Sequence, residues 1–189
     1  MLTWQRVISP SLESVRLLFS EGRLRASGRI IAAENAADGV EPFSGSFSAS
    51  VERADEAARL LLRTTTADEE RQVSLSRTED GVWLVDHGHG ATRNAFDGAL
   101  DVDVVGAVTF NGFPIRRLGL HQTPGEHELP VVCVTLPDLT VSLVRQTYRT
   151  LSVSATGAVI NYTDPNFTAD LTVDTHGMVV DFPGRAKRI

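Results

Sequence analysis

The chain has 189 residues, of which 42% are hydrophobic and 22% charged, and its 24 acidic and 18 basic residues give a net charge of −6. This composition is typical of a soluble globular protein, and we expect one domain, residues 1–189, with a sizeable core. The negative charge excludes the basic footprint of a nucleic-acid-binding protein. A single cysteine, Cys133, excludes an internal disulfide.

The sequence also argues against a membrane-embedded or exported protein. No stretch approaches the roughly 20 apolar residues that span a bilayer. The N-terminus lacks a basic segment followed by an apolar run, which is the signal-peptide pattern. We therefore expect a cytoplasmic protein without a membrane span. Cys133 lies in the apolar run 131–136, which favours a buried, inert thiol over a nucleophile.

Alternating apolar and polar residues predict strands through the first half of the chain. The clearest are residues 24–32 and 43–51, and in the second of these, serines form one face. A turn at 35–41 separates them. Residues 71–77 and 82–86 then predict a β-hairpin.

Residues 52–63, ERADEAARLLLR, fit two interpretations. Their alanine, leucine and charged residues have good helix propensity. Ala58, Leu60 and Leu62 nevertheless alternate with other residues, and three consecutive threonines from Thr64 favour a strand.

The second half of the chain also reads mostly as strands. They are predicted at residues 129–136, 140–151, 153–162, 167–173 and 178–182. So many strands with one short helix predict a single curved antiparallel sheet or barrel.

The stretch 97–120 joins a short acidic strand to a short helix. In an extended chain Val102 and Val104 point to one side, and Asp101 and Asp103 to the other. Two carboxylates on one strand face invite pairing with nearby cations.

The helix that follows is expected at about residues 113–119. Asn111 can cap its start, and Gly119 can close it in a left-handed conformation. Arg116 and Arg117 lie within it. Because the planar guanidinium binds a carboxylate through two parallel hydrogen bonds, we expect ion pairs to the two preceding aspartates.

This stretch resembles the signature of the bacterial family described as "Putative glycolipid-binding". DVDV followed by FNGFPIRRL is similar to the family's DVDL followed by NTLPIRRL. Further pieces match in order at Trp4 and at residues 81–83, 146–148, 173–174 and 177–183. The resemblance implies a spiral β-roll, which is a long sheet wound around one helix. It favours a strand at 52–63 and implies a glycolipid-binding role. Gly112 and Ala107 stand where the family usually has threonine, so the roles of those hydroxyl groups do not carry over.

Other chemistry has weaker support in the sequence. Asp101 and Asp103 form a D-x-D pattern that can hold a divalent cation, but few other oxygen ligands are near, and we favour anchoring of an arginine. His87 and His89 could bind zinc, yet no third ligand is recognisable, and we favour a solvated turn. No nucleophile elbow or phosphate-binding loop is present. We therefore expect no catalytic residue, metal or cofactor.

The sequence leaves a set of candidate ligand-binding residues. Arginines suit an anionic head group, and aromatic rings suit the rim of a sugar or lipid site, although core packing is the simpler interpretation of each ring. The candidates are Arg116, Arg117, Asp101, Asp103, Asn111, Trp83 and Tyr148.

Three functions remain open on these residues. The first is a non-enzymatic binder of an amphipathic ligand, a glycolipid or acyl lipid, in the hollow concave interior of the β-roll. The second is a structural or interaction protein with a filled core that forms a homodimer. The third is an enzyme acting on a lipid-like substrate through Asp101, Asp103, Arg116 and Arg117.

Overall fold

A computed structural model describes residues 1–7, 10–20, 23–35, 39–52 and 57–189. The first half of the chain forms the strands β1 (Leu2–Arg6), β2 (Ser11–Ser20), β3 (Arg23–Ala32), β4 (Phe43–Glu52), β5 (Ala57–Thr65), β6 (Glu70–Arg77), β7 (Trp83–Asp86) and β8 (Thr92–Asn94). The second half forms η1 (Phe96–Gly98), β9 (Asp101–Val104), η2 (Val108–Asn111), α1 (Gly112–Arg117), β10 (Glu126–Val134), β11 (Val141–Ser154), β12 (Gly157–Asp164), β13 (Phe167–Asp174), β14 (Val179–Phe182) and β15 (Ala186–Arg188).

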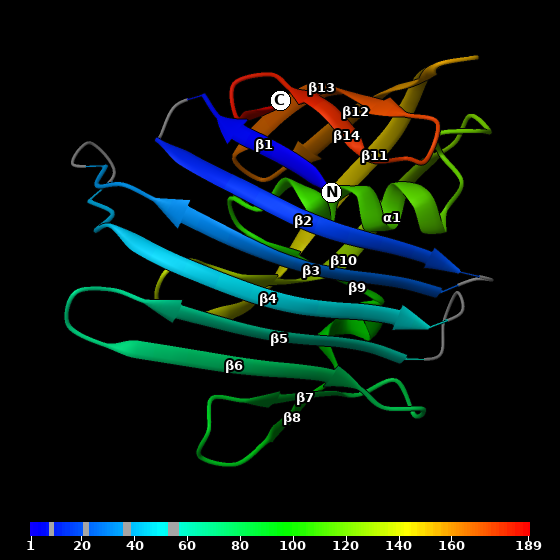
Figure 1. Cartoon of the computed structure of the whole chain (residues 1–189). Coiled ribbons are helices and arrows are strands. Elements are labelled where there is room, and N and C mark those ends of the chain that lie inside the picture. The colour runs from blue at the N-terminus through cyan, green and yellow to red at the C-terminus, as the bar shows by residue number, and fades with distance from the viewer. Residues whose placement is uncertain (8–9, 21–22, 36–38, 53–56) are drawn as a thin grey trace.

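These strands form one long sheet with the order β8-β7-β6-β5-β4-β3-β2-β1-β15-β14-β13-β12-β11-β10-β9 in the described part of the chain. The first and last strands pair side by side, with Trp4 opposite Arg188. Strands β2–β6 form one wall, and the sheet turns over so that β9–β11 lie behind it (Figure 1). The predicted mainly-β fold, a curved sheet around one short helix, is confirmed.

We had predicted an antiparallel sheet, but one pair of its strands is parallel. Strands β9 and β10 are parallel, with Val131 opposite Asp101. The chain between them passes through η2 and α1, and such a crossover connection brings the second strand back in the same direction.

Most predicted strands are present, with shifted ends. Buried and exposed residues alternate without a break along β3, as the sequence pattern predicts. The ambiguous region 52–63 is β-strand from Ala57 onward, and its residues 53–56 lie outside the described residues. The predicted break between 151 and 153 is wrong, because β11 continues to Ser154. Strands β1, β2, β8 and β15 were not predicted.

The interior beside the helix is packed with aromatic rings. Phe110 of η2 lies between Phe47 of β4 and Phe113 of α1, with ring centroids 5.0 and 5.2 Å apart. The two candidate rim rings, Trp83 and Tyr148, are fully buried in the core. Three further rings, Trp4, Tyr162 and Phe182, are at most 2% exposed. The expected hollow interior is therefore filled here, and α1 is wedged between the two walls.

The two helix-end predictions had different outcomes. Gly119 has φ +67°, and the N–H groups of Leu120 and Gly119 donate to the carbonyls of Ile115 and Arg116 at 3.0 and 3.1 Å. This is the Schellman arrangement that glycine favours. Asn111 does not cap the helix start. Its side-chain amide donates instead to the hydroxyl of Tyr148, at 3.3 Å.

A methyl group added at Gly28 should destabilise the fold, and one added at Gly45 should not. A Cβ at Gly28 would lie 2.4 Å from the Phe47 ring and 2.9 Å from Val15, whereas at Gly45 the nearest atom is 3.6 Å away. The Phe47 ring is held by Phe110 and cannot yield easily. We expect Gly28→Ala to lower the free energy of unfolding by about 1–3 kcal/mol, measured by urea denaturation. Equal losses in Gly28→Ala and Gly45→Ala would contradict this packing.

Candidate functional site

A cavity of about 460 Å³ opens at one end of the roll, beside the helix. Because neighbouring strands run in opposite directions, the end of β2, the start of β3 and the end of β4 meet here, and β9 and α1 close the other side. We call this space the mouth cavity. Its lining residues are Phe19, Ser20, Arg23, Leu24, Val51, Asp101, Phe113, Arg116, Arg117, His121 and Gln122.

An ion pair between Arg117 and Asp101 forms one wall of the mouth cavity. The Arg117 Nε and Nη2 atoms donate to the two carboxylate oxygens at 3.2 and 2.5 Å. The arginine side chain is 15% exposed and the aspartate 5%. This is the predicted two-bond geometry, and it holds the last turn of α1 against the edge strand β9.

Arg116 points to the other side of the helix and has different partners. Its guanidinium carbon lies 4.2 Å from the centre of the Phe19 ring, and its Nη1 donates to the carbonyl of His176 at 3.1 Å. Phe19 also stacks on the His176 ring. Arg116 thus pairs with neither aspartate, and the expected ion pair of this arginine is wrong. Its positive charge is positioned at the cavity by an aromatic ring and a carbonyl.

His121 adds a buried polar group to the lining. The residue is 5% exposed, and its Nδ1 atom has no hydrogen-bond partner among the residues that the structure describes. Burial lowers the pKa of His121 from its ordinary value, so the imidazole is neutral at pH 7. A neutral imidazole can donate from one nitrogen and accept at the other.

Asp103 lies in the core, away from the arginines of α1. Gln146 donates to its carboxylate at 2.7 Å, and Tyr148 donates its hydroxyl proton to Gln146 at 2.9 Å. Asn111 extends this chain through its bond to Tyr148. Burial raises the pKa of Asp103. Asp103, Asn111 and Tyr148 therefore connect β9, η2 and β11 in the interior, and none of them lines the mouth cavity.

The remaining sequence candidates lie elsewhere. Trp83 is fully buried and donates its indole N–H to the carbonyl of Ala99 at 2.8 Å. His87 and His89 are exposed after β7. Among the described residues, no group of three His, Cys, Asp or Glu side chains could hold a metal ion. Cys133 is buried, and burial raises the pKa of its thiol to about 12, so it is not a nucleophile at neutral pH.

Glu13 is a buried acid that sequence analysis did not single out. It lies on the inner face of β2, 2% exposed, and accepts the backbone N–H groups of Val108 and Thr109 at 2.6 and 3.3 Å. It thereby satisfies the first free N–H groups of η2. Burial raises the pKa of Glu13 to about 7.

Several cavity residues were also missed, and the reason is their distance in sequence. Phe19, Leu24 and Val51 meet Phe113 and His121 only because the sheet turns over. The sequence signal for these residues was the apolar end of the segment 11–20. The alternation of apolar and polar residues in that segment is interrupted, because the polar Ser11 and Glu13 lie on its inner face.

Comparison with known proteins agrees with this fold. The sequence profile of the family described as "Putative glycolipid-binding" matches residues 1–188. The chain belongs to this family. None of the curated proteins matches it.

Two solved structures are similar to this member of the family. One is a DUF1089 family protein from Pseudomonas aeruginosa, with 27% identity, a TM-score of 0.75, and coverage of 97% of this chain and 95% of that one. The other is a β-barrel-like protein of the domain of unknown function DUF1849 from Brucella abortus, with 10% identity, a TM-score of 0.62, and coverage of 100% and 93%. The second likeness shows the fold alone. The described helices are also too short and polar for any of them to cross a bilayer.

The Arg117–Asp101 pair should stabilise the protein much more than an exposed pair. Asp101→Asn removes the carboxylate and leaves a mostly buried guanidinium without its counter-charge. We expect the free energy of unfolding to fall by about 2–4 kcal/mol. Asp80→Asn is the control, since Asp80 and its partner Arg93 are 63% and 60% exposed, and it should change stability little. Urea denaturation of both variants tests this, and similar losses would contradict it.

Glu13 should make the protein less stable as the pH rises. Its pKa is higher in the folded protein than its ordinary 4.5, so the folded state holds the proton more tightly. Its contribution is complete below pH 4.5 and is lost as pH rises through 7. The difference in unfolding free energy between wild type and Glu13→Gln should therefore shift by about 3 kcal/mol against wild type between pH 4 and 8.5. Parallel pH curves for the two proteins would refute this.

Proposed function

We propose that the protein binds an amphipathic ligand, a glycolipid or acyl lipid, in the mouth cavity and does not alter it chemically. The observation that supports this most is the division of the cavity lining into an apolar and a polar side. A volume of about 460 Å³ lies within the range of pockets that bind small molecules.

The apolar side would hold the hydrocarbon part of the ligand. Leu24 and Phe113 are buried side chains of β3 and α1, and Val51 is half-buried at the end of β4. Phe19, 37% exposed, stands at the entrance. Covering these groups with an acyl chain would remove apolar surface from water, the main favourable term in such binding.

The polar side would hold the head group. The Arg117–Asp101 pair offers a carboxylate that accepts hydrogen bonds and a guanidinium that donates them. The two bonds between these groups hold both in place. Sugar hydroxyls both donate and accept, and thus suit such a pair. Arg116, which forms no ion pair with the described residues, would add affinity for an anionic substituent.

The lining also supports binding without catalysis. The two buried acids with raised pKa values, Glu13 and Asp103, lie outside the mouth cavity. Asp101 is engaged by Arg117, and Cys133 is a buried neutral thiol. The family to which the chain belongs is described in terms of glycolipid binding, which agrees with this proposal.

Blocking the mouth cavity should weaken ligand binding without unfolding the protein. Gln122 is exposed and lines the cavity, whereas its neighbour Thr123 is exposed and does not. Native mass spectrometry would follow the binding of n-octyl β-D-glucoside below its micelle concentration. We expect Gln122→Trp to bind at least about tenfold more weakly than wild type, a loss of roughly 1.4 kcal/mol, and Thr123→Trp to bind as wild type does.

Glucose and octanoate, tested separately, should each bind more weakly than octyl glucoside, because each occupies only one side of the cavity. Equal binding by Gln122→Trp and Thr123→Trp, or no binding by wild type to octyl glucoside and other short-chain glycolipids, would contradict the proposal.

A further inference from the structure

Four serines occupy the outer face of β4, and longer side chains stand on both sides of them. Serines recur at every second position of this strand, at Ser44, Ser46, Ser48 and Ser50. The register places Ser46 between Arg29 of β3 and Arg63 of β5, and Ser50 between Arg25 and Arg59. Because serine is short and arginine long, this register makes a trough with a hydroxyl floor and arginine walls.

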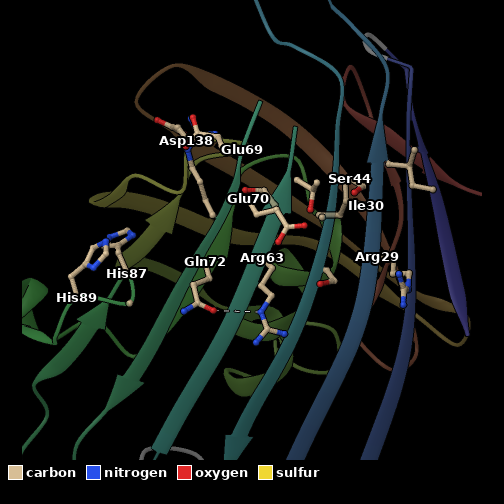
Figure 2. Close-up of a pocket in the computed structure, with 17 residues that line it drawn as sticks. Arg29, Ile30, Ser44, Arg63, Glu69, Glu70, Gln72, His87, His89 and Asp138 are labelled. Atoms are coloured by element: carbon tan, nitrogen blue, oxygen red, sulfur yellow. Dashed lines mark hydrogen bonds and ion pairs between the residues drawn. The ribbon is translucent and has the colours of Figure 1, made fainter. Parts of the chain in front are cut away.

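The trough appears as two hollows on the outside of the sheet, one toward each end of β4. The larger, about 800 Å³, includes Ser44, Ser46, Arg29 and Arg63 in its lining. The smaller, about 420 Å³, includes Ser48, Ser50, Arg25, Arg59 and also Arg16 of β2. Figure 2 shows the larger hollow, with Arg29 and Arg63 on neighbouring parts of the sheet and His87 and His89 at one side.

Arginines are concentrated beside the serines of β4. All five, Arg16, Arg25, Arg29, Arg59 and Arg63, are exposed, and none takes part in the ion pairs found in the part of the chain that the structure describes. Arg63 donates to the neutral amide of Gln72, at 3.5 Å. Three carboxylates, Glu69, Glu70 and Asp138, also line the larger hollow, together with Arg71, which pairs with Glu69. The described lining of the smaller hollow contains three arginines and no carboxylate. A protein of net charge −6 thus places five arginines on one face of its sheet, on the strands β2, β3 and β5.

We propose that this trough binds a linear acidic polysaccharide. Opposed arginines lie two strands apart, so their Cα atoms are separated by about 10 Å. Successive arginines on one strand are four residues apart, which separates their Cα atoms by about 13 Å. Carboxylate or sulfate groups along an extended sugar chain would meet guanidinium groups on both sides. Serine hydroxyls on the floor would donate to and accept from the sugar hydroxyls between them.

The shape and chemistry of the trough favour a polysaccharide over other polyanions. Its lining includes no Phe, Tyr or Trp, the rings on which the bases of single-stranded nucleic acid stack. A bilayer surface would rest on the arginine ends and leave the serine floor unused. This trough is also separate from the mouth cavity, with which it shares no lining residue, so its test does not depend on the proposed lipid ligand.

Removing two wall arginines should weaken binding more than removing two arginines elsewhere. The double variant Arg29→Gln/Arg63→Gln is compared with Arg93→Gln/Arg149→Gln, which makes the same change in net charge at exposed positions on β8 and β11. Isothermal titration with a heparin decasaccharide at 150 mM salt provides the readout. We expect at least about tenfold weaker binding for the first variant and near wild-type binding for the second. Equal losses would overturn the proposal.

A second variant tests the floor rather than the charge. Ser46→Phe places a bulky ring, well tolerated in strands, between two arginines without changing the charge. It should weaken decasaccharide binding at least about tenfold. Unchanged binding would show that charge alone attracts the decasaccharide, and would overturn the proposal that the trough is its binding site. Binding of polyglutamate, oligothymidylate or phosphatidylglycerol vesicles as tight as that of the decasaccharide would overturn it as well.

Discussion

A sheet that winds around on itself needs something to fill its inner face, and here the segment from η2 to α1 does so. Phe110 and Phe113 pack against Phe47 of the opposite wall. The segment enters the core at η2, where the Glu13 carboxyl group accepts hydrogen bonds from the first two free backbone N–H groups. It leaves at the end of α1, where Arg117 is bound to Asp101. One carboxylate at each end thus fixes the segment in place.

The position of the mouth cavity follows from these two contacts. Because α1 is only six residues long and stops at a glycine-closed turn, it fills the middle of the roll and leaves the end open. The last turn of the helix brings Arg116 and Arg117 to that opening. The same ion pair that holds the helix therefore also presents a polar surface beside Phe19 and Leu24, and stability and ligand recognition would depend on the same residues.

The sequence was informative wherever local spacing decides the structure. The serine alternation of β4 and the glycine that closes α1 were both correctly interpreted. Strand β2 was missed because its inner face includes Glu13, while Leu12 and Leu18 point outward, 45% and 47% exposed. With a polar residue inside and leucines outside, the strand lacks the alternation of apolar inner and polar outer residues by which strands are recognised. Contacts made across the sheet, such as that of Gln146 with Asp103, depend on strand register between distant segments, which no local pattern encodes.

We infer that the open end of the roll, rather than its filled middle, receives an amphipathic ligand. A crystal structure of the protein with octyl glucoside tests it most directly. We expect electron density for the octyl chain against Leu24 and Phe113, with the sugar within hydrogen-bond distance of Asp101 or Arg117. Density for the ligand only on the outer face of the sheet, or an empty mouth cavity at saturating ligand, would contradict it.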